Sequence, residues 1–312
     1  MTEVRALPAP RGPAIIGHGG AGSDRTLSDR VLRGVQAGVP RFREGGALEA
    51  AVAGTAALED DPSFNAGTGS ALRTDGVTVQ MDAAVMNDRG EFGAVAAIER
   101  VQNPVLVARA VLDSPHLLLA GEGATRLARA LGMAEYDPTT DEARARHRRL
   151  LDALARGRIP ETWRRFDLGR AWNYAAALPE ELRTCDTVGV VARGAIGGFA
   201  TTASSGGFGL MLNGRVGDVP VLGSGCYAGR AGAVCATGDG EAIVRAAVSR
   251  RVYEWLEAGQ RPERSVALGL DLVPSSTSLG ILALGTGGGA AGAHASMAWA
   301  AVLDGTEVLA SA

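Results

Sequence analysis

Residues 184–189 read Thr184-Cys185-Asp186-Thr187-Val188-Gly189, and the character of the chain changes abruptly there. From about residue 135 to residue 186 the sequence is polar and Arg-rich, with scattered Trp and Tyr residues and no strand pattern. The residues that follow, Thr187–Ala192, form a short apolar run that predicts a buried strand. A connector therefore meets a buried strand at a threonine. Threonine is common in strands, so this junction alone indicates little about function.

Hydrophobic periodicity on both sides of this junction predicts an α+β fold. Strands are expected at Ala14–Ile16, Val77–Val85, Phe92–Ile98, Thr187–Ala192, Phe199–Ala203, Leu279–Leu284 and Ala298–Val302. Helices are expected from near Leu27 and at Leu48–Glu59, Pro104–Leu112, Ala124–Leu131, Ala143–Arg156 and Glu241–Leu256. Because strands follow one another as hairpins between groups of helices, the order predicts antiparallel sheets covered by helices.

The composition excludes several classes of function. The 312 residues leave one or two domains open, and their net charge of -3 offers no basic footprint for nucleic acid or an anionic membrane. All 31 basic residues are Arg. Without Lys, a G-x-x-x-x-G-K-[ST] phosphate loop, a Schiff-base lysine and a lysine general base are excluded. A general base must be Asp, Glu, His, Cys, Tyr or a free α-amine.

The cysteine count and the N-terminal sequence favour a cytoplasmic protein with reduced thiols. The three cysteines are an odd number without C-x-x-C spacing, which indicates neither a zinc site nor a full disulfide framework. The first ten residues lack the apolar core of a signal peptide. The stretch Leu272–Leu303 carries no Asp, Glu, Lys or Arg but is interrupted by Pro274 and many Gly and Ser residues, so it predicts paired buried strands rather than a membrane helix.

The segment Gly17-His18-Gly19-Gly20-Ala21-Gly22 fits the G-x-G-x-x-G pattern of dinucleotide-binding loops. Such a loop opens a helix that leads to a parallel strand ending in an acidic residue. Here two helical patterns follow without a strand between them. We therefore favour a tight turn at which two backbones approach closely.

No Ser-His-Asp arrangement stands out, but a set of short segments carries a more specific pattern. On the C-terminal side they are Ala203-Ser204-Ser205-Gly206-Gly207, Gly214-Arg215-Val216-Gly217-Asp218, Gly225-Cys226-Tyr227-Ala228 and Ala236-Thr237-Gly238-Asp239-Gly240-Glu241. On the N-terminal side they are Gly19-Gly20-Ala21-Gly22, Phe64-Asn65-Ala66-Gly67, Met81-Asp82-Ala83 and Asn103-Pro104-Val105-Leu106. In this order they closely resemble the plant-type asparaginase and isoaspartyl peptidase family of N-terminal-nucleophile hydrolases, from about Ile15 to Leu256.

The resemblance implies a four-layer αββα sandwich that forms one domain over residues 1–312. Precursors of this family cut themselves before a threonine, here between Asp186 and Thr187. The products would be an α-chain of residues 1–186, with residues 135–186 as the connector, and a β-chain of residues 187–312. The implied assembly is a homo-oligomer, a dimer of such αβ heterodimers.

Thr187 is then the nucleophile, and its new α-amine is the general base. A free α-amine has a pKa of about 7.7 to 8.0, close to the operating pH, which suits a chain without Lys. Ser205 matches a family position usually held by Thr, whose hydroxyl orients the nucleophile. The resemblance assigns the oxyanion donors to the Thr237 hydroxyl and the Gly238 backbone N–H.

The resemblance also assigns the substrate contacts. Arg215 would bind the α-carboxylate and Asp218 the α-ammonium of an amino-acid head. Without the surrounding motifs, these two residues would instead indicate a surface ion pair. The full set of implied substrate-binding residues is Asn65, Arg215, Val216, Gly217, Asp218, Thr237, Gly238, Asp239 and Gly240.

No organic cofactor is implied, but a structural sodium ion is. The loop from Leu58 to Thr68 resembles one that binds sodium through backbone carbonyls, a mode of ligation that leaves no side-chain signature. The candidate ligands are Leu58, Glu59, Asp61, Phe64, Ala66 and Thr68.

These assignments predict an enzyme that cleaves the side-chain amide of L-asparagine, of β-aspartyl dipeptides or of both, and releases L-aspartate. A glycosylasparaginase-like amidase, which shares an acidic residue at the position of Asp186, and a non-processing binding protein of the same fold stay open as alternatives. The stretch Ser204–Gly207 also resembles threonine aspartase, but Asp218 differs from that protease and favours a small free amino-acid head. The segment Gly285–Trp299 departs most from the family and leaves the outer pocket undefined.

Overall fold

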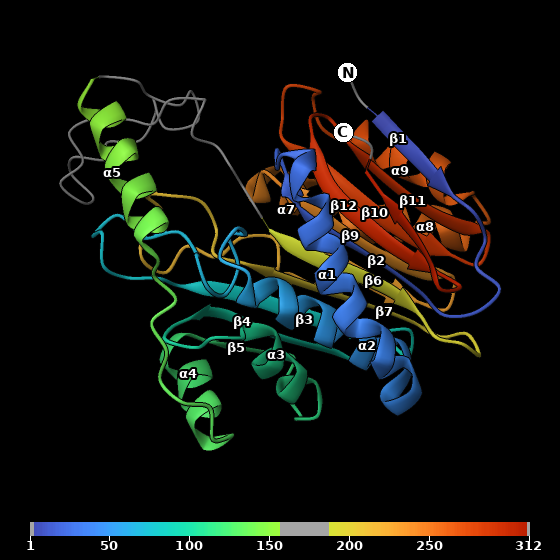
Figure 1. Ribbon diagram of the computed structural model, residues 1–312, viewed down its shortest axis with the longest axis horizontal. Helices are drawn as coiled ribbons and strands as arrows, with labels where there is room; N and C mark the ends of the chain where they lie inside the picture. The colour runs from blue at the N-terminus through green and yellow to red at the C-terminus, as the bar shows by residue number, and fades with distance from the viewer. Residues whose placement is uncertain (1–2, 157–186, 311–312) are drawn as a thin grey trace.

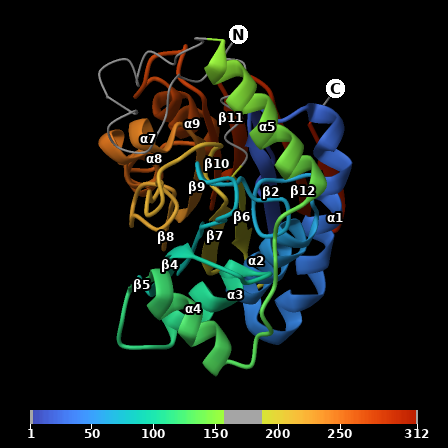
Figure 2. The same cartoon turned by 90° about the vertical axis from the view of Figure 1, so that its left-hand side faces the viewer.

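The computed structural model describes residues 3–156 and 187–310. Its strands form one sheet of eight strands and one of five, with helices on the outward faces of both (Figures 1 and 2). This arrangement confirms a mixed architecture of two sheets covered by helices. Within the described ranges, no helix is long and apolar enough to cross a membrane.

The eight-stranded sheet has the order β13-β12-β2-β6-β7-β3-β4-β5. Its strands are β2 (Ala14–Ala21), β3 (Met81–Asn87), β4 (Phe92–Ile98), β5 (Leu118–Ala120), β6 (Val188–Arg193), β7 (Phe199–Ser205), β12 (Met297–Leu303) and β13 (Thr306–Leu309). Neighbouring strands pair antiparallel except β4 and β5, which are parallel. The strand that begins directly after Thr187, β6, therefore lies in the interior of the sheet between β2 and β7.

The five-stranded sheet has the order β1-β11-β10-β9-β8 and is antiparallel throughout. Its strands are β1 (Glu3–Leu7), β8 (Cys226–Gly229), β9 (Gly232–Gly238), β10 (Leu279–Gly285) and β11 (Gly288–Ala293). Strand β9 lies against β6 and β7 of the other sheet, and β10 lies against β2. The C-terminal end of β9 is thereby brought to the start of β6.

The helices flank the two sheets. Those beside the eight-stranded sheet are α1 (Ser28–Gly38), α2 (Phe42–Asp60), α3 (Pro104–Leu112) and α4 (Gly121–Ala130), whereas α8 (Val248–Glu257) and α9 (Pro262–Leu270) pack on the five-stranded sheet. The others are α5 (Asp141–Ala155), α7 (Gly240–Ala246) and the short 3-10 turns η1 (Arg25–Leu27) and η2 (Val39–Arg41). Figure 2 shows α1 and α2 on one side of the strands, with α8 and α9 on the other.

Small and medium-sized apolar side chains fill the space between the sheets. This core combines residues of both sheets, among them Ile16, Ala84, Val191, Ala203, Cys226, Ala233, Cys235, Leu282, Leu284 and Ala301. Because a sheet that is covered on both faces has no solvent-facing side, the strands read as nearly continuous apolar runs. The burial of this apolar surface is the main force that holds the two sheets together.

Two cysteines lie in this inter-sheet core. Cys226 and Cys235 are both free and buried, as expected for reduced thiols, whereas Cys185 lies outside the described residues. Burial raises the pKa of Cys226 to about 12, so its thiol stays protonated and unreactive at neutral pH.

Most predicted elements are confirmed, but several boundaries were wrong. The strand expected from Val77 begins only at Met81, because the carboxylate of Asp75 accepts the N–H groups of Val77 and Thr78 and closes a turn there. The helix expected over Glu241–Leu256 is two helices, broken at Ala247, whose φ is 48°. Strands β1, β5, β8, β9, β11 and β13 and helix α9 were not predicted. Strands β8, β9 and β11 are rich in Gly and Ala, and β1, β5 and β13 have only three to five residues, so each gives a weak periodic signal.

The glycine-rich segment at residues 17–22 is mainly a strand, and the expected tight turn is confined to its end, where the Ser23 N–H donates to the Gly20 carbonyl oxygen at 3.3 Å. The strand β2 continues through it to Ala21, fully buried between β12 and β6. The expected close approach is present: a Cβ on Gly19 would lie 2.5 Å from the Phe64 ring. The glycines allow close packing along a strand, and they form no dinucleotide loop at the start of a helix.

The packing of β4 on α3 predicts a large effect for one added methyl group. A Cβ on Gly93 would lie 2.4 Å from both the Ala108 carbonyl oxygen and the Leu112 nitrogen, neither of which can move without distorting α3. We expect Gly93→Ala to lower the free energy of unfolding by about 1–3 kcal/mol.

The matched control is Gly123→Ala in α4, where no atom lies within 4 Å of the added Cβ. This substitution should be neutral or stabilise the protein by up to about 1 kcal/mol, because Ala has the higher helix propensity. Thermal unfolding of both variants is the measurement, and equal melting temperatures would contradict the packing argument.

Candidate active site

Thr187 lies directly before β6, and its hydroxyl is held by the neighbouring strand. It is 3% exposed, and its Oγ1 donates a hydrogen bond to Ser205 Oγ at 3.2 Å. Ser205 is the last residue of β7 and also accepts the Gly207 N–H at 2.9 Å. The antiparallel register pairs Val188 with Ser204, which brings the two hydroxyls to the same end of the sheet. The predicted pair of Thr187 and Ser205 is therefore in contact.

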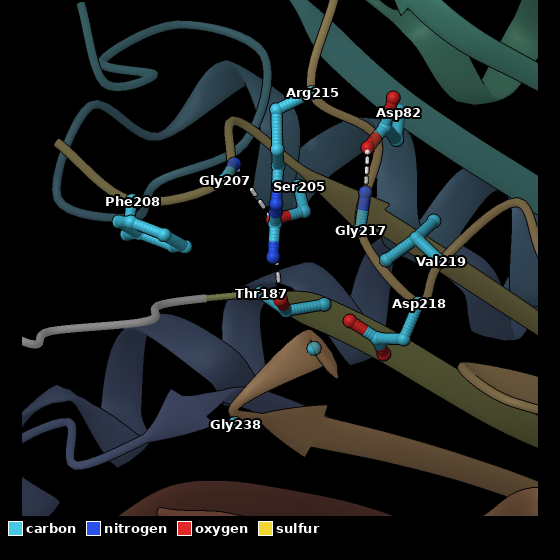
Figure 3. A pocket seen from close by; sticks show the side chains of 11 residues that line it. Asp82, Thr187, Ser205, Gly207, Phe208, Arg215, Gly217, Asp218, Val219 and Gly238 are labelled. Carbon is cyan, nitrogen blue, oxygen red and sulfur yellow. Dashed lines mark hydrogen bonds between the residues drawn. The ribbon is translucent and has the colours of Figure 1, made fainter. Parts of the chain in front are cut away.

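A cavity of about 260 Å³ opens in front of these hydroxyls (Figure 3). Its walls come from both sheets and from the loop between β7 and β8. The lining residues are Asp82, Thr187, Ser205, Gly207, Phe208, Arg215, Gly217, Asp218, Val219, Gly238 and Gly240. The fold thus brings Thr187, Ser205, Arg215, Gly217, Asp218, Gly238 and Gly240, all predicted from the sequence, to one cavity.

Arg215 presents a guanidinium that is already held by a carboxylate. Its Nε and Nη2 donate to the two carboxylate oxygens of Glu241 at 3.0 and 2.7 Å, and its guanidinium carbon lies 4.8 Å from the centre of the Phe208 ring. Burial alone would lower the pKa of Arg215, but the hydrogen-bonded Glu241 raises it above its ordinary value. Arg215 therefore stays charged in the cavity wall, paired with Glu241.

Asp218 is a buried carboxyl group in the same wall of the cavity as Arg215. It is 5% exposed, and among the described residues its Oδ2 has no hydrogen-bond partner. Burial raises the pKa of Asp218 to about 7, although the nearby charge of Arg215 opposes this shift. An unpartnered carboxylate oxygen of this kind is suited to receive a cationic group from a ligand.

Gly240 separates these two charged groups. A Cβ at Gly240 would lie 2.8 Å from Asp218 Oδ1 and 2.9 Å from Arg215 Nη2. A side chain at this position would therefore push the carboxylate and the guanidinium away from each other. The glycine keeps an anionic and a cationic group beside one another in the cavity wall.

The end of β9 supplies Thr237 and Gly238. Thr237 is fully buried, and its Oγ1 accepts the Ala21 N–H at 3.2 Å. Because that oxygen acts as an acceptor, its own O–H proton remains to be donated. Gly238 has φ of 138° and lies so close to Ser278 that a Cβ would meet the Ser278 carbonyl oxygen at 2.1 Å, so only glycine fits there.

Besides the buried Thr237, which is not among the described residues that line the cavity, three other predicted substrate-binding residues have other positions. Asn65 supports the loop after β7 with two hydrogen bonds. Its side-chain Nδ2 donates to the Gly207 carbonyl oxygen, and its backbone carbonyl oxygen accepts the Gly206 N–H at 2.8 Å. Asp239 caps α7 by accepting the Ala242 N–H at 3.0 Å. Val216 is 39% exposed. None of the three is among the described residues that line the cavity.

Comparison with known proteins bears directly on this arrangement. The family model described as Asparaginase matches residues 11–309. The chain is 41% identical to a plant-type L-asparaginase of Pyrococcus abyssi over 258 aligned residues. The aligned region covers 79% of this chain and 80% of the relative. It is 37% identical to an isoaspartyl peptidase of Salmonella typhimurium over 78% of each chain, and 37% identical to an isoaspartyl peptidase/L-asparaginase of Danio rerio over 83% of this chain and 80% of the relative. The chain belongs to the asparaginase family.

The Thr187 hydroxyl would need a general base in order to act as a nucleophile, and His18 is not that base. Its Nδ1 accepts the Gly20 N–H at 3.2 Å, which leaves the ring proton on Nε2, 3.4 Å from Cys235 Sγ. Burial lowers the pKa of His18 to about 3, although a hydrogen bond with the Thr187 backbone opposes this. The ring is therefore a neutral, packed group beside β6. In the intact chain it supplies no proton acceptor for the Thr187 hydroxyl.

The loop at residues 58–68 is closed by its own backbone. The Glu59 carbonyl oxygen accepts the Thr68 N–H at 2.8 Å, and the Asp61 carbonyl oxygen accepts the Phe64 N–H at 3.1 Å. The Glu59 side chain is buried and accepts the Val105 N–H at 3.0 Å, and burial raises its pKa to about 8. In the described ranges, no group of three or more His, Cys, Asp or Glu side chains is arranged to hold a metal ion.

Glu241, Phe208 and Asp82 were not predicted as site residues, and Asp186 lies outside the described residues. Glu241 is the last residue of the quoted segment Ala236–Glu241. Its contact with Arg215 could not be predicted, because only the folded chain brings the two residues together. Asp82 lies within the quoted segment Met81–Ala83 and gave no separate signal, because an acid in an alternating strand usually faces solvent.

The burial of Asp218 predicts a pH-dependent stability. Its pKa of about 7 in the folded state exceeds the ordinary value of 3.8, so the folded state binds a proton more tightly than the unfolded state. The stability from this group is complete below about pH 4 and is lost as pH rises toward 7, at up to about 1.4 kcal/mol per pH unit.

We expect Asp218→Asn to remove the loss of stability that accompanies a rise in pH from 4 toward 7. The melting temperature of the variant relative to the parent should rise between pH 4 and pH 7.5, when ligand is absent and ionic strength is constant. Parallel curves for the two proteins across this range would show that Asp218 titrates normally.

Proposed function

We propose that this chain is a self-processing threonine amidohydrolase that cleaves the side-chain amide of L-asparagine and of β-aspartyl dipeptides and releases L-aspartate. The observation that carries the proposal is the Thr187 hydroxyl, hydrogen-bonded to Ser205, in a small cavity that also holds Arg215 and Asp218. The names of the relatives, L-asparaginase and isoaspartyl peptidase, support the same activity.

The charges of the cavity match an amino-acid head group. A free aspartyl head carries an α-carboxylate and an α-ammonium on one carbon, and the cavity offers Arg215 and Asp218 on either side of Gly240. In the described contacts Glu241 occupies Nε and Nη2 of Arg215, so Nη1 is the guanidinium nitrogen left for the substrate carboxylate. A zwitterion bound in this way would direct its side-chain amide toward Thr187.

Activation requires a base beside the Thr187 hydroxyl, and among the described residues the hydrogen-bond partner of that hydroxyl is Ser205, which is not a base. Cleavage of the bond between Asp186 and Thr187 would create an α-amine on the nucleophile itself, with a pKa of about 7.7 to 8.0. The mature protein would consist of an α-chain of residues 1–186 and a β-chain of residues 187–312, folded as one domain. We infer a four-layer αββα sandwich of the N-terminal-nucleophile hydrolase type and a dimer of αβ heterodimers, working in the cytoplasm.

The reaction then proceeds in two steps. The Thr187 oxygen attacks the side-chain carbonyl carbon while the α-amine takes the hydroxyl proton and passes it to the leaving nitrogen. The C–N bond breaks, ammonia or a peptide amine departs, and a β-aspartyl ester remains on Thr187. Water that loses a proton to the same amine hydrolyses this ester and releases L-aspartate. The Gly238 N–H and the Thr237 hydroxyl stabilise the oxyanion in both steps.

The loop at residues 58–68 fits a sodium ion held by backbone carbonyls. Each carbonyl oxygen that accepts one N–H in this loop keeps a second lone pair, and neutral oxygen ligands suit a hard cation. A Cβ on Gly67 would lie 2.5 Å from the Glu59 carbonyl oxygen, so the loop folds closely around these groups. The proposed ligands are the carbonyls of Leu58, Glu59, Asp61, Phe64, Ala66 and Thr68, and the ion would stabilise the loop.

A sodium ion bound here would raise the stability of the folded protein. We expect a higher melting temperature in sodium chloride than in choline chloride at the same ionic strength, since a ligand that binds only the folded state stabilises it by mass action. A free sodium concentration of ten times the dissociation constant would add about 1.4 kcal/mol to the free energy of unfolding. Equal melting temperatures in the two salts would refute the sodium site.

The nucleophile assignment is tested by Thr187→Ala. Without the hydroxyl, the variant should remain one intact chain and lose turnover of L-asparagine and β-aspartyl dipeptides by at least about a thousandfold. Intact mass and denaturing electrophoresis report cleavage, and release of L-aspartate reports turnover. A parent protein that stays intact and inactive would instead favour the non-processing binding protein, and one active only on glycosylasparagine would favour the glycosylasparaginase-like amidase.

Adjacent serines provide a matched pair for the positioning of Thr187. Ser205→Ala removes the hydroxyl that holds Thr187 Oγ1 and should slow both self-cleavage and turnover by about tenfold. Ser204 lies one residue earlier in β7 and is also buried, but its side chain points to the opposite face of the sheet from that of Ser205, so Ser204→Ala should leave both rates unchanged. Equal effects of the two substitutions would contradict the role of Ser205.

A further inference from the structure

Strand β4 contains a bulge opposite Asp82. The ladder between β3 and β4 pairs Met81 with Ile98 and then Ala83 with Val95, so one extra residue of β4 stands opposite Asp82. Ala97 in this bulge has φ of 49°, a left-handed conformation that is unfavourable for a residue with a Cβ. Bulges of this kind redirect side chains and persist where the surrounding structure holds them.

The carboxylate of Asp82 holds the bulge on one side and the substrate cavity on the other. Its Oδ1 accepts the N–H of Ala97 at 2.8 Å, and its Oδ2 accepts the N–H of Gly217 at 3.0 Å. Gly217 belongs to the turn that carries Arg215 and Asp218. Figure 3 shows the hydrogen bond from Gly217 to Asp82 to the right of Arg215 and above Asp218. The carboxylate thus connects the interior of a sheet to the turn that bears both charged groups.

A buried arginine holds the same turn by its carbonyl. Arg73 is 1% exposed, and its Nη2 donates to the Arg215 carbonyl oxygen at 3.2 Å and to the Gln80 carbonyl oxygen at 2.9 Å. Burial lowers the pKa of Arg73 to about 10, and the charge of Asp82 opposes this shift. The turn is therefore fixed at the Arg215 carbonyl by a cation and at the Gly217 N–H by an anion.

Asp82 itself has little capacity left for a substrate. It is 3% exposed, and each of its oxygens accepts a backbone N–H. Burial raises its pKa, while the two N–H groups and the charges of Arg73 and Arg215 stabilise the carboxylate form. An uncharged Asn at this position offers only one acceptor oxygen, so one of the two N–H groups would lose its partner.

We propose that Asp82 is a positioning residue of the reaction: its carboxylate, directed by the bulge at Ala97, fixes the Gly217 backbone and thereby the spacing of Arg215 and Asp218. The inference rests on the proposed function, in which these two residues bind the amino-acid head. The backbone of Asp82 pairs with that of Ser205 across β3 and β7, but its carboxylate accepts the N–H groups of Ala97 and Gly217. Loss of the carboxylate alone should therefore weaken substrate binding and leave the chemical step nearly intact.

The test compares Asp82→Asn and Asp82→Ala with the parent on two substrates, L-asparagine and succinamic acid, which lacks the α-amino group. For L-asparagine we expect a KM about ten to a hundred times higher, with kcat within about threefold of the parent. The preference in kcat/KM for L-asparagine over succinamic acid should fall by about tenfold. Titration with L-aspartate provides a second readout, with its Kd raised to a similar degree.

Asp304→Asn is the matched control, because Asp304 also accepts two backbone N–H groups, those of Arg11 and Gly12, away from the cavity. It should change neither KM nor the preference. If the Asp82 variants have a lower melting temperature but keep the parental KM, preference and affinity for L-aspartate, Asp82 is merely structural and the inference fails. A parent protein that hydrolyses neither substrate and does not bind L-aspartate would instead refute the proposed function.

Discussion

The antiparallel pairing of β6 with β7 is the constraint on which the site depends. This pairing places the Thr187 hydroxyl 3.2 Å from that of Ser205 at one end of the eight-stranded sheet. Strand β6 also packs closely on the other sheet. A Cβ on Gly189 would lie 2.3 Å from Cys235 Sγ and 2.6 Å from His18 Nε2, so a larger residue there would displace β6 from β9. The close contact of the two sheets brings Gly238, at the end of β9, into the same cavity as Thr187.

Charge is the second constraint, because the cavity wall concentrates ionic groups where water is scarce. Arg215 is paired with Glu241, and Arg73 is electrostatically coupled to Asp82, whereas Asp218 keeps an unpartnered oxygen. A buried charge without a partner is costly, and folded proteins retain such groups mainly where a ligand completes them. Within the part of the chain that the structure describes, Asp218 thus differs from Arg215 in that its carboxylate is incompletely paired.

Sequence reasoning succeeded where a residue and its partner lie in short, ordered segments. Thr187, Ser205, Arg215, Asp218 and Gly238 were each placed by local motifs, and the structure brings them to one cavity. It failed for elements whose conformation depends on distant neighbours. The Gly-rich segment of β2 has the composition of a turn, yet it is a buried strand because β6 and β12 supply its hydrogen-bond partners. The break at Ala247 between α7 and α8 could not be predicted, because no Gly or Pro stands there in the sequence.

The sequence by itself determined the family pattern, the apolar strands, the absence of a lysine base and the identity of the residues offered to a substrate. These properties depend on residue type and on local order along the chain. Only the tertiary structure decided that Glu241 holds Arg215, that Asn65 supports the loop after β7, and that Asp82 anchors the turn at Gly217. The physical reason is that a hydrogen bond needs two groups within about 3 Å, and groups separated by 26 to 142 residues meet only after the sheets have packed.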